Sequence, residues 1–264
     1  MKHKNYVWIL ALLFATSVFA QHQKEYVKEY LVEGTDTLKL RVLYPKDFKK
    51  TEGYPVVLFL HGAGERGNDN KKQLIHGSKM FVDSIEKHPA IVVFPQCQQN
   101  DFWANATVDR TTQPIALKFP KDSKPTKGLH LVMRYLDELV KNPYIKKDQI
   151  YVGGLSMGGM GTFELLSRKP ELFAAAFAIC GGGNAELAEK YAKSTAMWVF
   201  HGAEDNVVNP QLSVDMVSAL LKYGGKPNFN LYSKANHNSW DAAFAEPELL
   251  SWLFSNIKNK NTDE

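Results

Sequence analysis

The stretch that most constrains this chain is residues 150–166, where the sequence pattern changes from that of a strand to that of a helix around one serine. Residues 150–152 (IYV) are β-branched or aromatic, as in a buried strand. From residue 157 onward apolar side chains recur at helical spacing, which predicts a helix that begins near Met157. Between the two lie residues 154–158 (GLSMG), a G-x-S-x-G arrangement. The chain is therefore expected to reverse sharply at Ser156.

A serine at the apex of such a turn has a strained backbone, with no room for side chains two positions to either side, which explains the two glycines. The turn lifts the Ser156 hydroxyl above the sheet and directs free N–H groups of the new helix toward whatever binds beside it. The same pattern also arises when a serine merely caps a helix in a glycine-rich turn. The motif alone is compatible with both interpretations, and the rest of the chain decides between them.

Strand-like and helical segments alternate from residue 54 onward, which predicts an α/β fold with a mostly parallel central sheet and helices on both faces. The strand-like runs are apolar almost throughout, and they lie at residues 54–60, 90–95, 150–152, 174–179, 195–200 and 229–232. Helices are expected at residues 71–88 and 129–141 and after the serine. Residues 25–45 alternate instead, which predicts an antiparallel hairpin at the edge of the sheet. Sheets of this kind bind ligands at the carboxyl ends of their strands.

The loop after the first central strand is rich in glycine, with the sequence HGAGERG at residues 61–67. Glycines there let backbone amides approach a ligand, and the loop is close to the HGGG type that supplies a second oxyanion donor in α/β hydrolases. The alternative is an ordinary turn between a strand and a helix. The charges of Glu65 and Arg66 are expected to pair with each other or with neighbours and so to hold the shape of the loop.

A serine hydroxyl is a weak nucleophile near neutral pH, so Ser156 needs a base to accept its proton and an acid to orient that base. On this type of fold the acid and the histidine follow the serine in chain order, each just past a later strand. Asp205 lies in the loop after residues 195–200. We prefer it to its neighbour Glu204 because it is the shorter acid and stands three residues beyond Gly202.

His237 is the one histidine, of eight in the chain, that follows the last predicted strand in a loop. His61 and His201 directly precede the glycines of their own loops, where structural hydrogen bonds are expected. No group of His, Asp or Glu residues has the spacing of a metal site such as H-E-x-x-H. The predicted catalytic residues are therefore Ser156, Asp205 and His237, with no metal and no cofactor.

Residues 98–128 are polar, contain three prolines and carry isolated aromatic side chains. Long irregular connections inside compact domains are commonly binding loops or lids, so this segment is predicted to be a lid or binding-loop insertion. Two candidate substrate-binding residues lie in or beside it, Trp103 and Gln96, with Trp103 expected to stack on a ligand ring. The alternative for Trp103 is that it only fixes the loop to the body of the protein.

Residues 1–20 have the pattern of a secretory signal peptide, because two lysines precede a short apolar run and small residues suit cleavage before Gln21. A buried N-terminal helix is the alternative. The apolar run is short for a membrane span, so the product is expected to be exported, periplasmic or secreted, without a membrane anchor. Residues 21–264 are expected to form one catalytic domain, because no break in composition divides them.

The formal net charge of +4 is spread along the chain without a dense block of Lys and Arg, so nucleic acid and anionic membranes are not favoured partners. Cys97 and Cys180 are the two cysteines, and each follows a separate predicted core strand. Two cysteines do not make a disulfide framework. Two buried free thiols are therefore favoured over a bridge.

Four segments, in this order and at these separations, resemble the α/β-hydrolase serine esterases of the polyhydroxybutyrate depolymerase, feruloyl esterase and phospholipase/carboxylesterase group. They are LHGAGERG (60–67), GGLSMGGMGTFEL (153–165), HGAEDNVV (201–208) and ANHNSW (235–240). The similarity covers nearly the whole mature chain, from about residue 26 to residue 252. The chain lacks the cysteine richness and the polymer-binding module of the secreted depolymerases, which argues against a polymer substrate.

The resemblance implies a serine carboxylesterase that works through an acyl-enzyme. Exported bacterial relatives of this type commonly act on esters that decorate plant polysaccharides, so feruloyl and acetyl esters are the expected substrates. By the same resemblance each site residue has a role: Ser156 is the nucleophile, Asp205 the acid and His237 the base, the amides of Met157 and of Ala63 or Gly64 are oxyanion donors, and Trp240 lines the site.

Two other functions remain open at the level of sequence. One is a peptidase related to the prolyl oligopeptidases, although no gating domain accompanies this chain. The other is a non-catalytic binding protein on a hydrolase scaffold, because a fold by itself does not establish an activity. The acyl and alcohol parts of the substrate and the oligomeric state are not given by the sequence.

Overall fold

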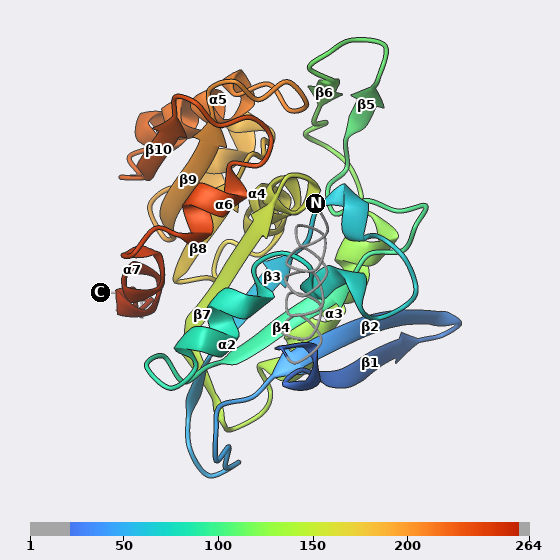
Figure 1. Cartoon of the computed structure of the whole chain (residues 1–264), viewed down its shortest axis with the longest axis vertical. Helices are drawn as coiled ribbons and strands as arrows, with labels where there is room; N and C mark the ends of the chain where they lie inside the picture. The colour runs from blue at the N-terminus through green and yellow to red at the C-terminus, as the bar shows by residue number, and fades with distance from the viewer. Residues whose placement is uncertain (1–21, 259–264) are drawn as a thin grey trace, which may run out of the picture.

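The computed structural model describes residues 22–258, and its main feature is an eight-stranded sheet with the order β1-β2-β4-β3-β7-β8-β9-β10 (Figure 1). The strands of this sheet are β1 (Val27–Glu33), β2 (Asp36–Leu43), β3 (Tyr54–Leu60), β4 (Ile91–Gln96), β7 (Ile145–Leu155), β8 (Ala175–Ile179), β9 (Ala196–Gly202) and β10 (Asn228–Tyr232).

The two N-terminal strands run antiparallel to their neighbours, and all strands from β4 to β10 in the sheet order run parallel. The register brings Leu60, the last residue of β3, opposite Gly154 of β7. The carboxyl ends of the parallel strands therefore meet along one edge. The expected α/β fold, with a mostly parallel sheet and an antiparallel hairpin at its edge, is confirmed.

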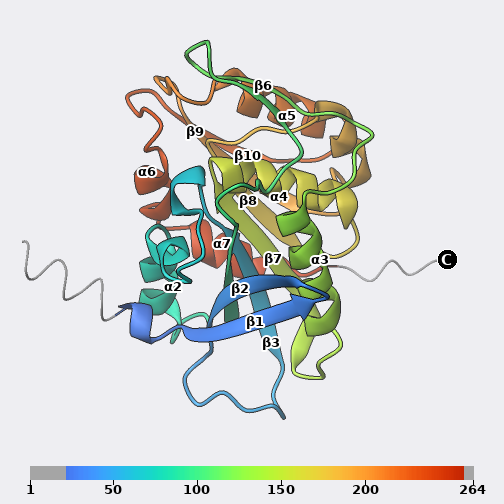
Figure 2. The ribbon, with the colours of Figure 1, turned by 90° about the vertical axis from the view of Figure 1, so that its right-hand side faces the viewer.

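Helices cover both faces of the sheet (Figure 2). One face packs against α3 (Lys127–Leu139), α4 (Met157–Arg168) and α5 (Gln211–Lys222), and the other against α2 (Ser78–Ser84), α6 (Trp240–Phe244) and α7 (Leu249–Ser255). Successive side chains of a strand point to opposite faces. Leu58 of β3 accordingly packs with the first helix group, whereas Phe59 packs with the second. This two-sided burial explains why the central strands are apolar without interruption.

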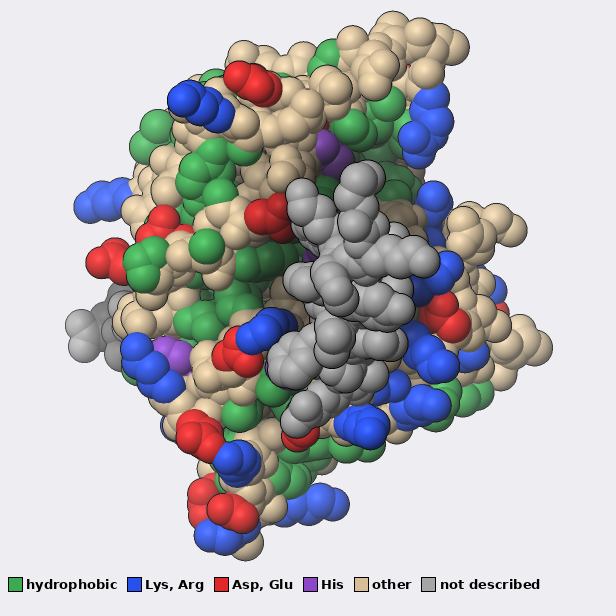
Figure 3. Space-filling view, in the orientation of Figure 1, with side chains coloured by type: hydrophobic (Ala, Val, Ile, Leu, Met, Phe, Trp, Pro, Cys, Tyr) green, Lys and Arg blue, Asp and Glu red, His purple; other side chains and the backbone are tan. Residues whose placement is uncertain are grey.

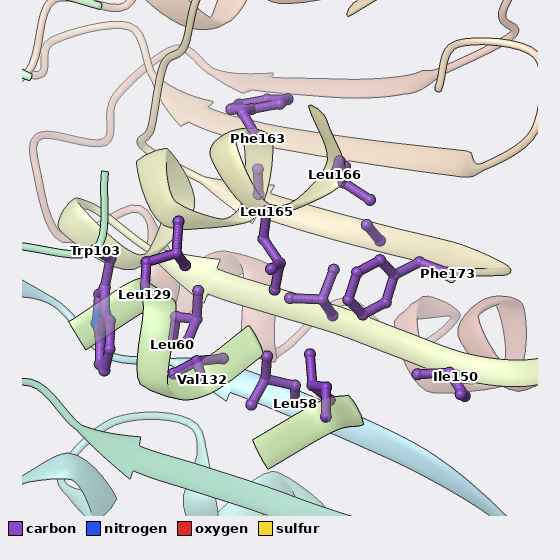
Figure 4. Close-up of a cluster of buried hydrophobic side chains, with 14 of the residues drawn as sticks. Leu58, Leu60, Trp103, Leu129, Val132, Ile150, Phe163, Leu165, Leu166 and Phe173 are labelled. Atoms are coloured by element: carbon purple, nitrogen blue, oxygen red, sulfur yellow. The ribbon is translucent and has the colours of Figure 1, made fainter. Parts of the chain in front are cut away.

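Figure 4 shows the core between β3 and the helices α3 and α4, where Leu58 and Leu60 face Leu129 and Val132. All four side chains are almost fully removed from solvent. Burying a leucine or valine side chain contributes about 2 kcal/mol to folding. Helix α4 packs in this core and begins at the residue after Ser156. The packing of α4 therefore also holds the turn that carries Ser156.

The helix expected at residues 71–88 is much shorter in the structure. A single 3-10 turn, η2 (Lys72–Leu74), precedes α2, and Gly77 with a φ of +80° separates the two. Such a φ lies in the left-handed region, which interrupts a helix. A Cβ on Gly77 would also lie 3.1 Å from ring atoms of Phe59 and Phe244. The helix predicted over residues 71–88 is therefore limited to residues 78–84, and Gly77 separates it from the 3-10 turn before it.

The predicted insertion, residues 98–128, contains a small two-stranded hairpin formed by β5 (Thr107–Asp109) and β6 (Ala116–Lys118). It projects from the body beyond the carboxyl ends of the central strands (Figure 1). A β-bridge between Ile115 and Val208 connects it to the loop after β9. Each strand has only three residues, too few for a recognisable alternation.

The predicted signal peptide, residues 1–20, lies outside the described residues. Within residues 22–258, no helix is long and apolar enough to cross a membrane.

Cys97 and Cys180 are both buried and both free. Two further 3-10 helices are η1 (Ala63–Glu65) and η3 (Ala185–Lys190).

Candidate active site

Ser156 lies at a sharp turn between β7 and α4, with a φ of +52° and a ψ of −117°. Its amide donates a hydrogen bond to the carbonyl of Ile179 on β8, at 2.8 Å. The turn needs glycine at positions 154 and 158, because a Cβ on Gly158 would lie 1.9 Å from the carbonyl oxygen of Leu60. The strained conformation predicted from G-x-S-x-G is therefore present, and the Ser156 hydroxyl stands at the carboxyl edge of the sheet.

Three side chains predicted from distant parts of the sequence form a hydrogen-bonded series. Ser156 Oγ lies 3.0 Å from His237 Nε2, and His237 Nδ1 lies 2.8 Å from Asp205 Oδ2. Because Asp205 can only accept when ionised, His237 carries its proton on Nδ1, and Nε2 is free to accept the proton of the serine. Ser156 and His237 are partly exposed, whereas the Asp205 side chain is fully buried.

A close approach of two loops brings the histidine to the acid. The loop after β10 passes so near to Gly202 that a Cβ there would lie 2.3 Å from the carbonyl oxygen of Ala235 and 2.4 Å from that of Asn236. The amide of Glu204 also donates to the carbonyl of Ala235, at 3.0 Å. Gly202 is therefore required by the packing of the histidine loop against the acid loop, which no local sequence pattern specifies.

Asp205 accepts hydrogen bonds at both carboxylate oxygens. Oδ1 accepts from the amides of Val207 and Val208, each at 2.9 Å, and Oδ2 accepts from His237 and from His201 Nε2, which is 3.2 Å away. Burial acts to raise the pKa of this carboxyl, but the hydrogen bonds from His201, His237 and the Val208 amide outweigh it. The pKa of Asp205 is thereby held well below its usual range, and the group stays ionised.

His201 is a second histidine behind the acid, and it is completely buried. Its Nε2 faces Asp205 and the carbonyl of Val208 at 3.1 Å, both of which only accept, so Nε2 carries a proton. Its Nδ1 lies 2.7 Å from the hydroxyl of Ser213, which is in turn 3.1 Å from the carbonyl of Gly181. His201 therefore contacts the same carboxylate oxygen as His237 and helps to orient the acid, as its expected structural role implies.

The loop after β3 is fixed by hydrogen bonds from its neighbours. His61 Nδ1 donates to the carbonyl of Gly62 at 2.6 Å, and Nε2 accepts from the amide of Cys97 at 3.0 Å. Arg66 donates to the carbonyls of Ala63 at 3.0 Å and Asp101 at 3.2 Å. The structural roles expected for His61 and Arg66 are present. Of the two pairings expected for Glu65 and Arg66, the structure shows the one with neighbours, because Arg66 bonds the two carbonyls and Glu65 lies 3.8 Å from His76.

A cavity of about 230 Å³ opens beside Ser156. Its walls include the three predicted oxyanion residues Ala63, Gly64 and Met157, and Met157 is the first residue of α4, whose opening N–H groups have no partner within the helix. The rest of the lining is mainly apolar. Its charged, hydroxyl or imidazole side chains are Glu65, His76, Arg110, Ser156 and His237. Its other residues are Gly62, Phe102, Val108, Ile115, Leu155, Met160, Val207, Val208 and Trp240.

Figure 3 shows the surface of the protein, with histidine side chains visible among apolar ones on the upper half of this face. A larger cavity, of about 710 Å³, lies at the opposite end of β8 and β9, around Lys193 and Lys258. None of the predicted site residues lines it. The smaller cavity is therefore the candidate active site.

Two of the three predicted substrate-binding residues lie away from this cavity. Trp103 is fully buried beside Leu60 and Leu129 (Figure 4), and its indole N–H donates to the carbonyl of His61 at 3.1 Å. The expected stacking of Trp103 on a ligand is therefore wrong. The alternative, an anchor of the loop to the body, is what the structure shows.

Gln96 is also buried, and its side chain is fully engaged by the loop that follows β3. Its amide oxygen accepts from the amide of Asn70 at 2.7 Å, and its nitrogen donates to the carbonyl of Glu65 at 3.2 Å. A substrate-binding role for Gln96 is not supported, because its polar atoms already have partners. Trp240, in contrast, lines the cavity, with its ring 5.4 Å from that of His237.

Several residues at the site were not assigned to it from the sequence. Cys180 follows β8, and its sulfur lies within 4.8 Å of ligand atoms of both Asp205 and His237. His76 and Arg110 line the cavity from the segment before α2 and from the β5–β6 hairpin. The position of Cys180 at the end of a central strand was a signal for it. No sequence signal places His76 or Arg110, because they approach from outside the sheet.

Comparisons with known proteins place this chain among esterases. The Esterase family model, described as "Putative esterase", matches residues 34–231, three quarters of the chain, and this range contains Ser156 and Asp205. The chain is 34% identical over 90 residues to a bifunctional acetylxylan esterase/xylanase of Neocallimastix patriciarum, which corresponds to 34% of this chain and 13% of that protein.

Solved structures give the same result. A thermostable esterase shares 31% identity with a TM-score of 0.79, over 90% of this chain and 64% of that one. A CE1 ferulic acid esterase from Anaeromyces mucronatus has the same fold, with 14% identity and a TM-score of 0.62, over 88% of this chain and 90% of that one. The chain thus spans less than two thirds of the acetylxylan esterase/xylanase and of the thermostable esterase. The resemblance drawn from four sequence segments is confirmed, and the chain belongs to the Esterase family, with the α/β-hydrolase fold.

Proposed function

We propose that this protein is an exported serine carboxylesterase that uses Ser156, His237 and Asp205 to cleave acetyl or feruloyl esters of plant polysaccharides or of oligosaccharides derived from them. The observation that carries the proposal is the unbroken series from Ser156 Oγ to His237 at 3.0 Å and from His237 to Asp205 at 2.8 Å. The names of two relatives, an acetylxylan esterase/xylanase and a ferulic acid esterase, support the substrate class.

In the proposed reaction His237 Nε2 takes the proton of Ser156 as the hydroxyl attacks the ester carbonyl. The amides of Met157 and of Ala63 or Gly64 stabilise the oxyanion that develops. The protonated His237 then gives its proton to the leaving alcohol, and a water molecule releases the acid from the acyl-enzyme by the same steps. One oxyanion donor is worth about 3 kcal/mol of barrier, so the shape of the loop after β3 matters nearly as much as the three side chains.

The test of this assignment is Ser156→Ala. We expect the variant to fold normally, with an unchanged thermal midpoint, and to lose hydrolysis of a short-chain aryl ester to the background rate. An active-site-directed phosphonate is expected to label Ser156 in the wild-type protein and to leave the variant unlabelled. Retained turnover in the variant contradicts the assignment, and absence of a Ser156 adduct in the wild-type protein favours a binding protein.

The bond that is cleaved is tested with a panel of acetyl, butyryl, feruloyl and acetylated-sugar esters, measured beside aminoacyl amides. The proposal predicts kcat/KM values for esters far above those for the amides, with the best values among acetyl or feruloyl esters of sugars. Faster cleavage of the amides favours the peptidase alternative.

Export is tested by expressing the full chain in a bacterial host and sequencing the N-terminus of the mature protein. We expect the mature chain to begin at Gln21 outside the cytoplasm, because cleavage follows small residues after the apolar run. Leu10→Arg, which interrupts that run, is expected to leave the protein uncleaved and inside the cell. Cleavage or export that is indifferent to this change contradicts the proposal.

A further inference from the structure

Glu65 places a carboxyl group in the wall of the active-site cavity, at the end of the loop that follows β3. The residue is only 8% exposed. Within residues 22–258 no hydrogen bond to its carboxyl oxygens is formed, and His76 Nε2 lies 3.8 Å from Oε1. Neither oxygen is among the fully buried side-chain atoms that lack a partner, so both remain accessible. Glu65 therefore has unused acceptor capacity that faces the space where the substrate binds.

Hydrogen bonds from other side chains hold the shape of the loop. Arg66 holds the loop through the carbonyls of Ala63 and Asp101, and Gln96 holds the backbone carbonyl of Glu65 itself, at 3.2 Å. The Glu65 side chain adds no hydrogen bond to this framework among the described residues. A purely structural role therefore leaves its position in the cavity unexplained.

Glu65 is the end of a continuous wall that begins at the catalytic histidine. The ring of Trp240 stands edge-on to His237, with centroids 5.4 Å apart, and the ring of His76 lies 5.2 Å from Trp240. His76 in turn lies beside Glu65. Starting from His237, the wall therefore consists of the Trp240 ring, the His76 ring and then the Glu65 carboxyl group.

The leaving alcohol of the ester meets this wall. His237 delivers its proton to the leaving oxygen, so the alcohol part of the substrate departs on the side of His237. A carboxyl group offers two oxygens that accept hydrogen bonds from adjacent hydroxyls, and aromatic rings offer an apolar surface. The apolar face and the neighbouring hydroxyls of a sugar ring match both features.

We propose that Glu65, together with Trp240 and His76, binds the hydroxyl groups of a sugar in the alcohol part of the ester. The proposal rests on the proposed esterase function and adds the residues that recognise the leaving group. A substrate ammonium group is the rival partner for Glu65. It is disfavoured because Arg110, a permanent cation, lines the same small cavity.

The experiment compares two esters with the same acyl group, an acetylated methyl xyloside and ethyl acetate, with the wild-type protein and Glu65→Gln. A hydrogen bond to a charged group accounts for about 10–100-fold in rate. We therefore expect kcat/KM for the xyloside ester to fall by about 10–100-fold, while kcat/KM for ethyl acetate stays within about threefold. Glu204→Gln, the same chemical change at an exposed acid outside the cavity, is the matched control and leaves both values unchanged.

Equal losses on both esters overturn the inference, because they show that Glu65 supports the oxyanion loop. Unchanged values for both esters overturn it too, because they show no contact with the alcohol. A selective loss on 2-aminoethyl acetate assigns the site to cations. A wild-type protein that cleaves no ester overturns the proposed function as well, which separates the two failures. If Glu65→Gln unfolds, Glu65→Asp is the second variant, because it keeps the charge but shortens the side chain by one methylene. We expect it to show a smaller selective loss of kcat/KM for the xyloside ester.

Discussion

At the scale of single residues, the loop after β3 is held by His61, whose protonation state is set by its buried surroundings. His61 donates from Nδ1 to Gly62 and accepts at Nε2 from the amide of Cys97, so both nitrogens have partners only when the ring is neutral. Burial lowers the pKa of His61 to about 4. Because the carbonyl of His61 also accepts from Trp103, protonation of this ring disturbs the anchor of the oxyanion loop.

His61 predicts a dependence of stability on pH. Its pKa is 6.5 in an unfolded chain and about 4 when folded, so the unfolded chain binds the proton more readily. The stabilisation is complete above pH 6.5 and is lost as the pH falls toward 4, by about 3 kcal/mol in total. Urea unfolding across this range is expected to show a flatter dependence for His61→Gln than for the wild-type protein. Parallel curves contradict the prediction. Asp205, whose pKa is lowered, acts only at still lower pH.

At the scale of elements, the site is made by close contacts between loops that follow different strands. Gly202 ends β9, and the carbonyls of Ala235 and Asn236, in the loop that carries His237, lie where a Cβ of residue 202 would be. The distance between His237 and Asp205 therefore depends on how closely two backbones approach. The serine turn depends on a similar contact, between Gly158 and Leu60.

Gly202→Ala is expected to reduce activity more than stability. The added methyl displaces the histidine loop, and a displacement of about 1 Å lowers the rate by about 100-fold. Overpacking of this kind destabilises a protein by about 1–3 kcal/mol. The measurements are kcat/KM on an aryl acetate and chemical unfolding. Gly53→Ala is the control, because its Cβ meets only the flexible Lys146 side chain, and both quantities should stay near wild type. Equal activity of the two variants contradicts this account.

At the scale of the whole molecule, the parallel sheet gathers the site from four separate strands. The loops after β3, β7, β9 and β10 supply the glycine loop, the serine, the acid and the histidine, and all four leave the same edge of the sheet. The β5–β6 hairpin is added from outside the sheet and places Val108, Arg110 and Ile115 in the cavity wall. On the proposed function, the loops after the strands carry the catalytic residues, and the hairpin forms part of the wall that the substrate meets.

Replacing residues 107–118 by a short Gly/Ser linker tests this division. The hairpin adds its own two-stranded sheet and one bridge to the body, so the variant is expected to stay folded and to retain phosphonate labelling of Ser156. Discrimination between acetyl and longer acyl esters is expected to change by about 10–100-fold, because an apolar wall of the cavity is removed. Loss of labelling contradicts the separation of catalysis from substrate choice.

The sequence by itself determined the sheet, its edge hairpin and the three hydrogen-bonded side chains. Central strands covered on both faces must be apolar throughout, and a serine turn between a strand and a helix admits only glycine beside it, so both leave local patterns. The order of Ser156, Asp205 and His237 follows from the fold, because each lies just beyond a strand that ends at the same edge.

Only the tertiary structure decided what surrounds these three residues. A side chain at the end of a strand, such as Gln96, or in an irregular segment, such as Trp103, has the same sequence context whether it faces a ligand or the core. This is why these two residues were misplaced. Their polar atoms found backbone partners in the loop after β3, which is distant in sequence from Trp103. Glu65, His201 and Arg110 acquired their positions in the same way, since contacts between loops depend on backbone distances that no local pattern records.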